Sequence, residues 1–208
     1  LSPWGYLLRH HDPTVATIFN SVTVPFESIA DTPCLALLGE PGIGKTFAMQ
    51  GEKDAIQARV REGGGKTLWL DLHSYGSEER LVHTLFEHQV FSNWLEGDHR
   101  LHLFLDSLDE CLLRIDTVAA ILGDVLAECP VDRLFLRIAC RTADWPISLE
   151  SSLKRLWGEE STNVYELAPL TRDDIAEAAT AHVPYPGVFL SEIERMDVVA
   201  LVMKPVTL

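Results

Sequence analysis

Two short segments carry residue types suited to holding phosphates and a metal ion. The first segment is Gly39-Glu40-Pro41-Gly42-Ile43-Gly44-Lys45-Thr46, and it fits the pattern G-x-x-x-x-G-K-[ST]. In this pattern backbone N–H groups surround phosphates, the lysine reaches the β- and γ-phosphates, and the hydroxyl meets Mg²⁺. Every residue of the segment is therefore a candidate for nucleotide binding, and Thr46 is also a candidate metal ligand.

The second segment ends an apolar run and is rich in carboxylates. Asp106 closes the run Leu101–Leu105, so its side chain is expected at the carboxyl end of a sheet, where ligands of such sheets bind. We therefore expect Asp106 to be a direct or indirect partner of Mg²⁺, the alternative being a surface carboxylate. Asp109 and Glu110 are candidates for orienting an attacking water, and the alternative is that they cap the next helix.

The first segment lies between two elements of the required kinds. The apolar residues 34–38 before it predict a buried parallel strand, and residues 45–61 after it contain no proline and predict a helix. The N-terminus of that helix would add unpaired N–H donors and its positive dipole end to an anion site. The alternative is that the glycines form an ordinary turn.

Strands and helices alternate through the middle of the chain, which predicts an α/β fold with a parallel sheet of five strands and flanking helices. The predicted strands are residues 34–38, 67–71, 101–106, 134–139 and 163–167. Between them, residues 78–95 and 116–128 predict helices. The helix at 116–128 has apolar residues at offsets of three, four and seven, which form one stripe that would face the sheet.

We expect three parts along the chain. Residues 1–33 contain several prolines and form a lead-in without a long regular element, and residues 34–168 form the nucleotide-binding domain. Residues 169–208 begin a small helical subdomain, because Thr171 is followed three residues later by Asp174 in the manner of a helix cap. The chain does not begin with Met and ends in an apolar stretch, so we expect a fragment of a longer protein.

The composition of the chain limits the kinds of partner that it can bind directly. The formal charge of −14 over 208 residues disfavours direct nucleic-acid or anionic-membrane binding, which needs clustered Lys and Arg. The four cysteines are too sparse for a disulfide scaffold, and no apolar run reaches transmembrane length. With 47% apolar residues, the sequence indicates a globular cytoplasmic segment.

The phosphate-binding segment together with Phe104-Leu105-Asp106-Ser107-Leu108-Asp109-Glu110 resembles the NACHT group of STAND NTPases. Three later segments agree with this resemblance. It implies that Arg141 is a sensor arginine near the γ-phosphate, that residues 167–175 enter the family's helical domain, and that Pro205 belongs to a proline motif near the adenine. The resemblance covers the chain from about residue 34 to its end.

The resemblance implies a signalling ATPase of a P-loop NTPase fold that binds ATP or ADP with Mg²⁺, hydrolyses ATP slowly and drives self-association of a larger protein with its own trigger and effector. The sequence around Arg141 and Pro169 is similar to that of bacterial members of the family, many of which act in defence against phage. One alternative is a module that holds nucleotide with negligible turnover. Another is an AAA-type ATPase, although Ser107 stands where many such enzymes have a catalytic glutamate.

Overall fold

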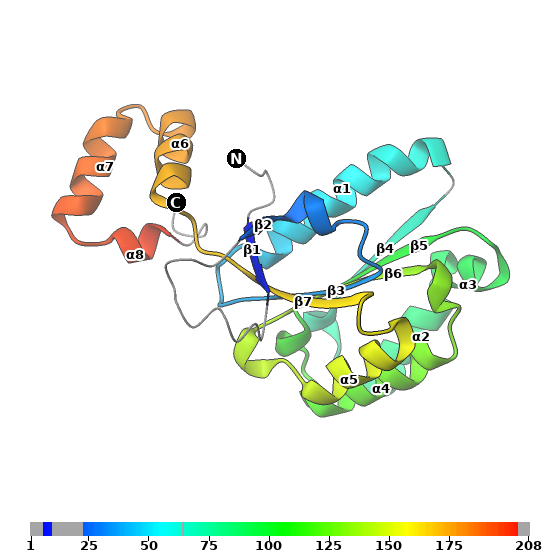
Figure 1. The fold of residues 1–208 in the computed structure, drawn as a ribbon. Helices are drawn as coiled ribbons and strands as arrows, with labels where there is room; N and C mark the ends of the chain where they lie inside the picture. Colours follow the sequence, from blue (N-terminus) through cyan, green and yellow to red (C-terminus); the bar gives the residue numbers. More distant parts are fainter. Residues whose placement is uncertain (1–5, 10–22, 64, 204–208) are drawn as a thin grey trace.

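A seven-stranded sheet in the order β2-β1-β7-β3-β6-β5-β4 forms the centre of the protein in a computed structural model, which describes residues 6–9, 23–63 and 65–203 (Figure 1). The five predicted strands are confirmed and run parallel: β3 (Cys34–Leu38), β4 (Lys66–Asp71), β5 (Leu101–Asp106), β6 (Leu134–Cys140) and β7 (Thr162–Leu167). Two strands that the sequence did not predict extend the sheet beyond β7: β1 (Tyr6–Arg9) is antiparallel to β7, and β2 (Val24–Pro25) is antiparallel to β1.

The parallel strands are apolar because helices cover both faces of the sheet. Helix α1 (Lys45–Gly63) packs on one face, while α2 (Glu78–Glu87), α3 (Gln89–Glu96), α4 (Ile115–Ala127) and α5 (Ile147–Trp157) contribute to the core on the other (Figure 1). All of β3 is buried, with alternate side chains in the two cores. The carboxyl ends of the strands therefore meet at one edge, where the loop between β3 and α1 also lies.

One predicted helix needs correction, and one helix was missed. The single helix expected over residues 78–95 is divided at His88, which has extended backbone angles and whose Nδ1 accepts a hydrogen bond from the Val90 N–H at 3.2 Å. His88 thus caps α3, and its imidazole replaces an intrahelical contact at that point. Helix α5 was not predicted, although Pro146 directly before Ile147 is a helix-start signal.

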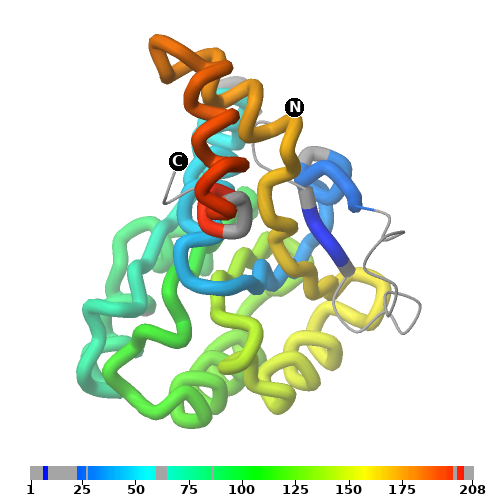
Figure 2. Tube along the Cα trace, turned by 90° about the vertical axis from the view of Figure 1, so that its left-hand side faces the viewer, coloured from blue at the N-terminus to red at the C-terminus, as the bar shows by residue number. Residues whose placement is uncertain are grey.

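In the part of the chain that the structure describes, three helices follow the last strand: α6 (Arg172–His182), α7 (Pro186–Arg195) and α8 (Val199–Val202). They stand beside the sheet and have their own small apolar cluster around Ile175, Ile193 and Val202 (Figures 1 and 2). The predicted cap is confirmed, since Thr171 and Asp174 form a reciprocal capping box at the start of α6. Pro186 starts α7, where a proline at the first helical position is favourable.

Within the described ranges, no helix is both long enough and apolar enough to cross a membrane.

Candidate functional site

The loop between β3 and α1 has the backbone shape that its glycines allow. Gly39 has a φ of 152°, and a methyl group there would come within 2.8 Å of Ile43 Cγ2, so a larger residue does not fit. Gly44 has a φ of 100°, and α1 begins at the next residue. Because the first N–H groups of a helix lack intrahelical acceptors, the loop and the helix start together present donors and a positive dipole end to an anion.

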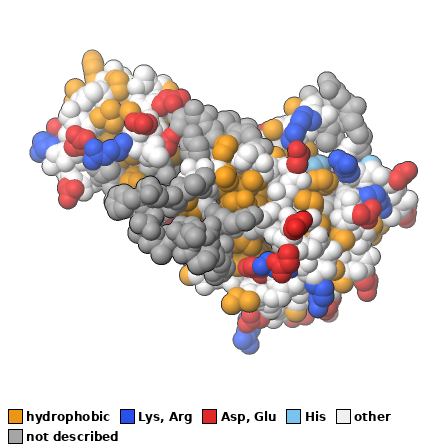
Figure 3. Space-filling view, in the orientation of Figure 1, with side chains coloured by type: hydrophobic (Ala, Val, Ile, Leu, Met, Phe, Trp, Pro, Cys, Tyr) orange, Lys and Arg blue, Asp and Glu red, His pale blue; other side chains and the backbone are white. Residues whose placement is uncertain are grey.

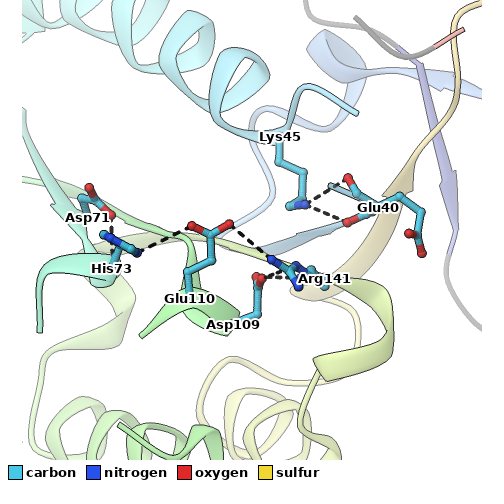
Figure 4. Close-up of polar contacts among 8 residues, drawn as sticks. Glu40, Lys45, Asp71, His73, Asp109, Glu110 and Arg141 are labelled. Atoms are coloured by element: carbon cyan, nitrogen blue, oxygen red, sulfur yellow. Dashed lines mark hydrogen bonds and ion pairs between the residues drawn. The ribbon is translucent and has the colours of Figure 1, made fainter. Parts of the chain in front are cut away.

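Lys45 lies across this loop. Its Nζ donates to the carbonyl oxygens of Gly39 at 2.7 Å and Glu40 at 3.3 Å (Figure 4). Burial lowers the pKa of Lys45, and the charge of Asp109 is the largest effect that opposes this. Arg141 and Asp106 also act on the same ammonium group. The lysine is therefore surrounded by the other predicted site residues, at the carboxyl edge of the sheet.

Asp106 ends β5 and reaches the start of α1. Its carboxylate interacts with the side chain of Thr46 and with the backbone N–H of Ser107, and the residue is 5% exposed. Burial raises the pKa of Asp106; the two hydrogen bonds oppose this shift, and the neighbouring charge of Asp71, paired with Asp106 across β4 and β5, adds to it.

A hydroxyl and one carboxylate side by side suit Mg²⁺, which is commonly held by one or two carboxylates together with phosphates and waters. Among the described residues no group of three or more His, Cys, Asp or Glu side chains could hold a metal ion. Thr46 and Asp106 therefore fit a metal that arrives with a phosphate better than a resident metal held by protein ligands alone.

A left-handed turn at Ser107 directs the next carboxylates. Ser107 has φ 59° and ψ 47°, a conformation that costs an L-residue about 1 kcal/mol or more. A short 3-10 turn, Leu108–Glu110, follows, while α4 begins only at Ile115 with Arg114 as its cap residue. Asp109 and Glu110 therefore do not cap the next helix, which was the alternative role for them.

Asp109 is bound to Arg141 through both of its oxygens. Oδ1 accepts the backbone N–H of Arg141 at 2.9 Å, and Oδ2 lies 2.8 Å from its Nε (Figure 4). The Asp109 side chain is 3% exposed, whereas that of Arg141 is 42% exposed. This geometry lets Asp109 orient the arginine directly after β6 and leaves part of the guanidinium open to solvent.

Glu110 lies between Arg141 and a histidine that the sequence analysis did not single out. Its Oε1 is 3.6 Å from Arg141 Nη2, and its Oε2 is 3.8 Å from His73 Nδ1 (Figure 4). His73 follows β4, and its backbone N–H donates to Asp71 Oδ1 at 3.1 Å. The signal that could have found this corner is Asp71, which ends an apolar strand as Asp106 does.

A cavity of about 430 Å³ opens beside the phosphate-binding loop, with Gly39 and Glu40 in its wall. Its apolar lining comes from β1, the loop, β7 and residues 169–203, here called the helical segment. The lining residues are Leu8, Ile43, Leu167, Pro169 and Met203. Ile43 was predicted as part of the phosphate-binding segment, whereas the other four were not predicted as site residues, because they meet the loop only in the folded chain. Pro205, which was predicted to lie near the adenine, is outside the described residues.

No family model and no curated protein matches this sequence. Among solved structures, the fold is similar to the Orc1 protein of Aeropyrum pernix in complex with DNA, with a TM-score of 0.54 and 14% identity over 74% of this chain and 47% of that chain. It is also similar to a DNA replication initiation factor, with a TM-score of 0.52 and 15% identity over 84% of this chain and 57% of that chain. This chain spans about half the length of these structures.

At this level of identity the likeness concerns the fold alone. Together with the strand order, in which β6 separates the strand before the loop from the strand that ends in Asp106, it shows that the chain has a P-loop NTPase fold. The phosphate-binding segment lies where this fold places its loop, between the first parallel strand and the helix after it.

Proposed function

We propose that this chain is the nucleotide-binding part of a signalling switch of the NACHT/STAND type, which binds ATP or ADP with Mg²⁺ and hydrolyses ATP slowly. The observation that carries the proposal is that Thr46, in the first turn of α1, lies beside Asp106, at the end of β5, close enough to lower its pKa. In P-loop NTPases the loop hydroxyl and a carboxylate at a strand end hold Mg²⁺ together.

The residues of the loop would divide the work as follows. Backbone N–H groups of the glycine-rich segment and the start of α1 bind the phosphates, and Lys45 supplies a positive charge at their centre. Thr46 and Asp106 would hold the metal. The bound Mg²⁺ would neutralise charge on the phosphate oxygens. The carbonyls of Gly39 and Glu40, which accept from Lys45, keep its ammonium directed into the loop.

Glu110 and Arg141 are the candidates for turnover. Asp109 is buried and engaged with Arg141, so it acts on the reaction by orienting that arginine. Glu110 is about half exposed and can accept a proton from, or orient, a water on the solvent side. Arg141 retains donors that could stabilise charge on the transferred phosphoryl group, as sensor arginines do.

The apolar cavity beside the loop is the proposed site of the adenine ring. Its volume of about 430 Å³ suits a nucleoside, and its lining by Ile43, Leu167 and Met203 would exclude water from the ring faces. Because Pro169 and Met203 belong to the helical segment, a bound base would contact both the sheet and the helices. We propose that Pro205 adds to the same surface.

The role proposed for the whole protein is based on the family resemblance. We propose that residues 34–168 form the nucleotide-binding domain, that residues 169–208 begin a helical subdomain, and that residues 1–33 are a lead-in. We further propose that the parent protein is cytoplasmic, self-associates when a trigger permits ATP binding, and passes the signal to an effector domain. Defence of bacteria against phage is the setting we propose for that signal.

The test is a thermal melt of the chain with Mg²⁺ and ADP, ATP or GTP. Ligand at a hundred times its dissociation constant adds about 2.7 kcal/mol to the free energy of unfolding, which for a chain of this size raises the melting temperature by roughly 5 to 10 °C. We expect this rise with adenine nucleotides, and we expect Lys45→Ala to remove it. Lys53→Ala, which changes a lysine of the same helix that lies 5.5 Å from the Trp69 ring, is the matched control and should keep the rise.

Two outcomes would count against the proposal. A folded wild-type chain whose melting temperature does not change with any nucleotide would remove the binding function. An equal rise in wild type and Lys45→Ala would mean that nucleotide binds elsewhere on the chain.

A second candidate function is a module that holds nucleotide without turnover. The burial of Asp109 against Arg141 favours it, because this leaves Glu110 as the one carboxylate of the 3-10 turn open to water. Phosphate release from Mg·ATP by wild type and Glu110→Gln separates the two functions. A rate in wild type that Glu110→Gln lowers at least about tenfold supports the ATPase, and equal rates favour the holding module.

A further inference from the structure

A second cavity lies at the opposite edge of the sheet from the phosphate-binding loop. Its volume is about 600 Å³, and it opens where the parallel strands begin. The end of α1, the turn before β4, the loop before β5 and the first residues of β5 and β6 form its wall. Nothing in the nucleotide site described above uses this cavity.

Two arginines supply positive charge to this cavity in a chain of formal charge −14. Arg59 comes from α1 and Arg100 from the loop before β5, and both are exposed. Neither guanidinium forms an ion pair with a described carboxylate, although Arg59 lies close enough to Glu52 to act on its pKa. Arginine binds phosphate and carboxylate groups in a planar, two-pronged manner, so this pair suits an organic anion.

A ring surface lies beside the arginines. His102 and Phe135 stack with ring centroids 4.8 Å apart and an angle of 26° between the rings, and the Arg100 guanidinium carbon is 5.6 Å from the centre of the Phe135 ring. Burial, with the positive charges of Arg137, Arg59 and Arg100, lowers the pKa of His102 to about 4. The histidine is therefore neutral at pH 7 and offers both a flat face and a hydrogen-bonding nitrogen.

The remaining polar groups of the cavity would form hydrogen bonds with the uncharged polar groups of a ligand. Asp31 and Asp98 on the rim can accept hydrogen bonds from hydroxyl or amino groups. His99 also lines the cavity, and its Nε2 is a buried polar atom for which the described residues provide no hydrogen-bond partner. This nitrogen is fully buried and is not open to the cavity, so Asp31 and Asp98 are the polar rim groups that a ligand can meet.

We propose that this cavity is a second ligand site, which binds a small organic anion carrying a planar ring, of the size of a mononucleotide. The anionic group would contact Arg59 and Arg100, and the ring would pack against Phe135 and His102. A volume of about 600 Å³ is in the range of sites for small molecules. The proposal does not depend on the proposed function, because none of these residues belongs to the phosphate-binding loop.

The kinds of side chain on this face of the molecule agree with the proposed site. Figure 3 shows Lys or Arg, acidic and His side chains gathered on the side of the molecule where β4, β5 and β6 begin, below the end of α1. Ile56 closes the apolar part of the wall with 3% exposure. A mixed, ring-lined pocket of this kind distinguishes a shaped organic anion from a simple ion, because only the former uses both the guanidinium groups and the aromatic faces.

The test uses the full chain with Lys45→Ala, so that the phosphate-binding loop contributes little. Isothermal titration calorimetry compares the common 5′-mononucleotides with nicotinate, a ring-bearing carboxylate, and with inorganic phosphate and adenosine, which each carry half of the chemistry. We expect at least one ring-bearing anion to bind with a dissociation constant below about 1 mM and at least about tenfold more tightly than phosphate or adenosine. A mononucleotide or nicotinate as the tightest probe would identify the source of the anion.

Variants then assign the site. Arg100→Ala and Phe135→Leu should each weaken binding by about tenfold, and Arg195→Ala, on α7 outside the cavity, should not. A thermal melt of each variant checks that it is folded, and Arg100 is an exposed loop residue whose loss should leave the fold intact. Absence of binding by every probe would overturn the proposal. So would binding that Arg100→Ala leaves unchanged, or inorganic phosphate binding as tightly as the best ring-bearing anion.

Discussion

Two arginines, one in the middle of strand β6 and one directly after its last residue, are both paired with carboxylates, yet their surroundings differ. Arg137 lies inside the strand, where it and Glu52 of α1 are each 2% exposed, and its Nε is 2.8 Å and 3.0 Å from the two carboxylate oxygens. Arg141 follows the strand directly and remains 42% exposed beside Asp109. The pair at Arg137 is enclosed by protein, and the pair at Arg141 is open on one side.

The number of donors already used accounts for the difference in role. The other nitrogens of Arg137 donate to backbone carbonyls, those of Thr32 at 2.7 Å, Leu136 at 3.0 Å and Ala30 at 2.6 Å. Arg137 therefore ties α1, β6 and the segment before β3 together and has no evident capacity for a ligand. Arg141 uses Nε on Asp109 and only a longer contact on Glu110, so it can still meet a phosphate. Burial and donor use, and not charge, separate a structural arginine from a functional one here.

The largest loss of stability is expected when the Arg137 side chain is removed. Arg137→Ala leaves Glu52 as a buried carboxylate without its partner and removes the arginine donors to three carbonyls, so we expect a loss of about 3 to 5 kcal/mol in the free energy of unfolding. For a chain of this size that lowers the melting temperature by roughly 10 °C. Urea unfolding of wild type and variant measures the loss.

A double variant tests the cause. Arg137→Met with Glu52→Leu removes both charges, and replacing a buried pair by apolar residues is often far less costly than breaking it. We expect the double variant to recover about 2 kcal/mol relative to Arg137→Ala. Equal losses in the two variants would show that packing and the backbone contacts, and not the unpaired charge, dominate at this site.

The positive charge of Arg137 also acts at the edge of the sheet where the parallel strands begin, and together with burial it contributes to the lowered pKa of His102. Burial, with Arg137, Arg59 and Arg100, lowers the pKa of His102 to about 4, below its usual 6.5. Between these values the unfolded chain binds a proton that the folded chain does not, so stability is lost as the pH falls from about 6.5 toward 4. At pH 5 we expect this residue to cost about 2 kcal/mol relative to pH 7.5.

Urea unfolding at pH 7.5 and pH 5 tests that expectation. His102→Gln should lose about 2 kcal/mol less than wild type between the two pH values, because glutamine does not titrate. His83→Gln is the matched control, since His83 is exposed on α2 beside Glu87. If wild type and His102→Gln lost the same stability, His102 would not be a buried neutral histidine.

The sequence predicted those features that local patterns control. β3 and β5 have the predicted bounds because their apolar runs are buried on both faces, and the loop follows from glycines whose backbone angles few other residues adopt. The reciprocal cap at Thr171 and Asp174 was likewise visible as a pair three residues apart. In each case the physical cause lies within a few residues of the element.

Features that depend on distant partners were not predicted. Arg137 and Glu52 are 85 positions apart, and the only local signal was a charged residue within an otherwise apolar strand. The pairing of β1 with β7 and the contact of His73 with Glu110 also join separate segments. The acidic segment after β5 indicated Asp109 and the family resemblance indicated Arg141, but only the fold reveals that they bind each other.

The smallest change in stability is expected at the open end of β6. Arg141→Ala removes a half-exposed ion pair, and such pairs contribute about 1 kcal/mol or less to folding. Asp109 would still accept the backbone N–H of residue 141, so its carboxylate would not be left without a donor. If the proposed ATPase function holds, the same variant should slow phosphate release about a hundredfold, because one donor to a developing charge is worth that much.

Arg141→Lys sharpens this last comparison. Lysine keeps the charge but cannot reproduce the Nε contact with Asp109 at 2.8 Å, so it should fold as wild type does and restore turnover only in part. Unfolding curves and phosphate release for Arg141→Ala, Arg141→Lys and wild type provide the test. A loss of stability in Arg141→Ala as large as that in Arg137→Ala would make both arginines structural. A small loss of stability with a large loss of turnover would assign holding the fold to Arg137 and contact with the nucleotide to Arg141.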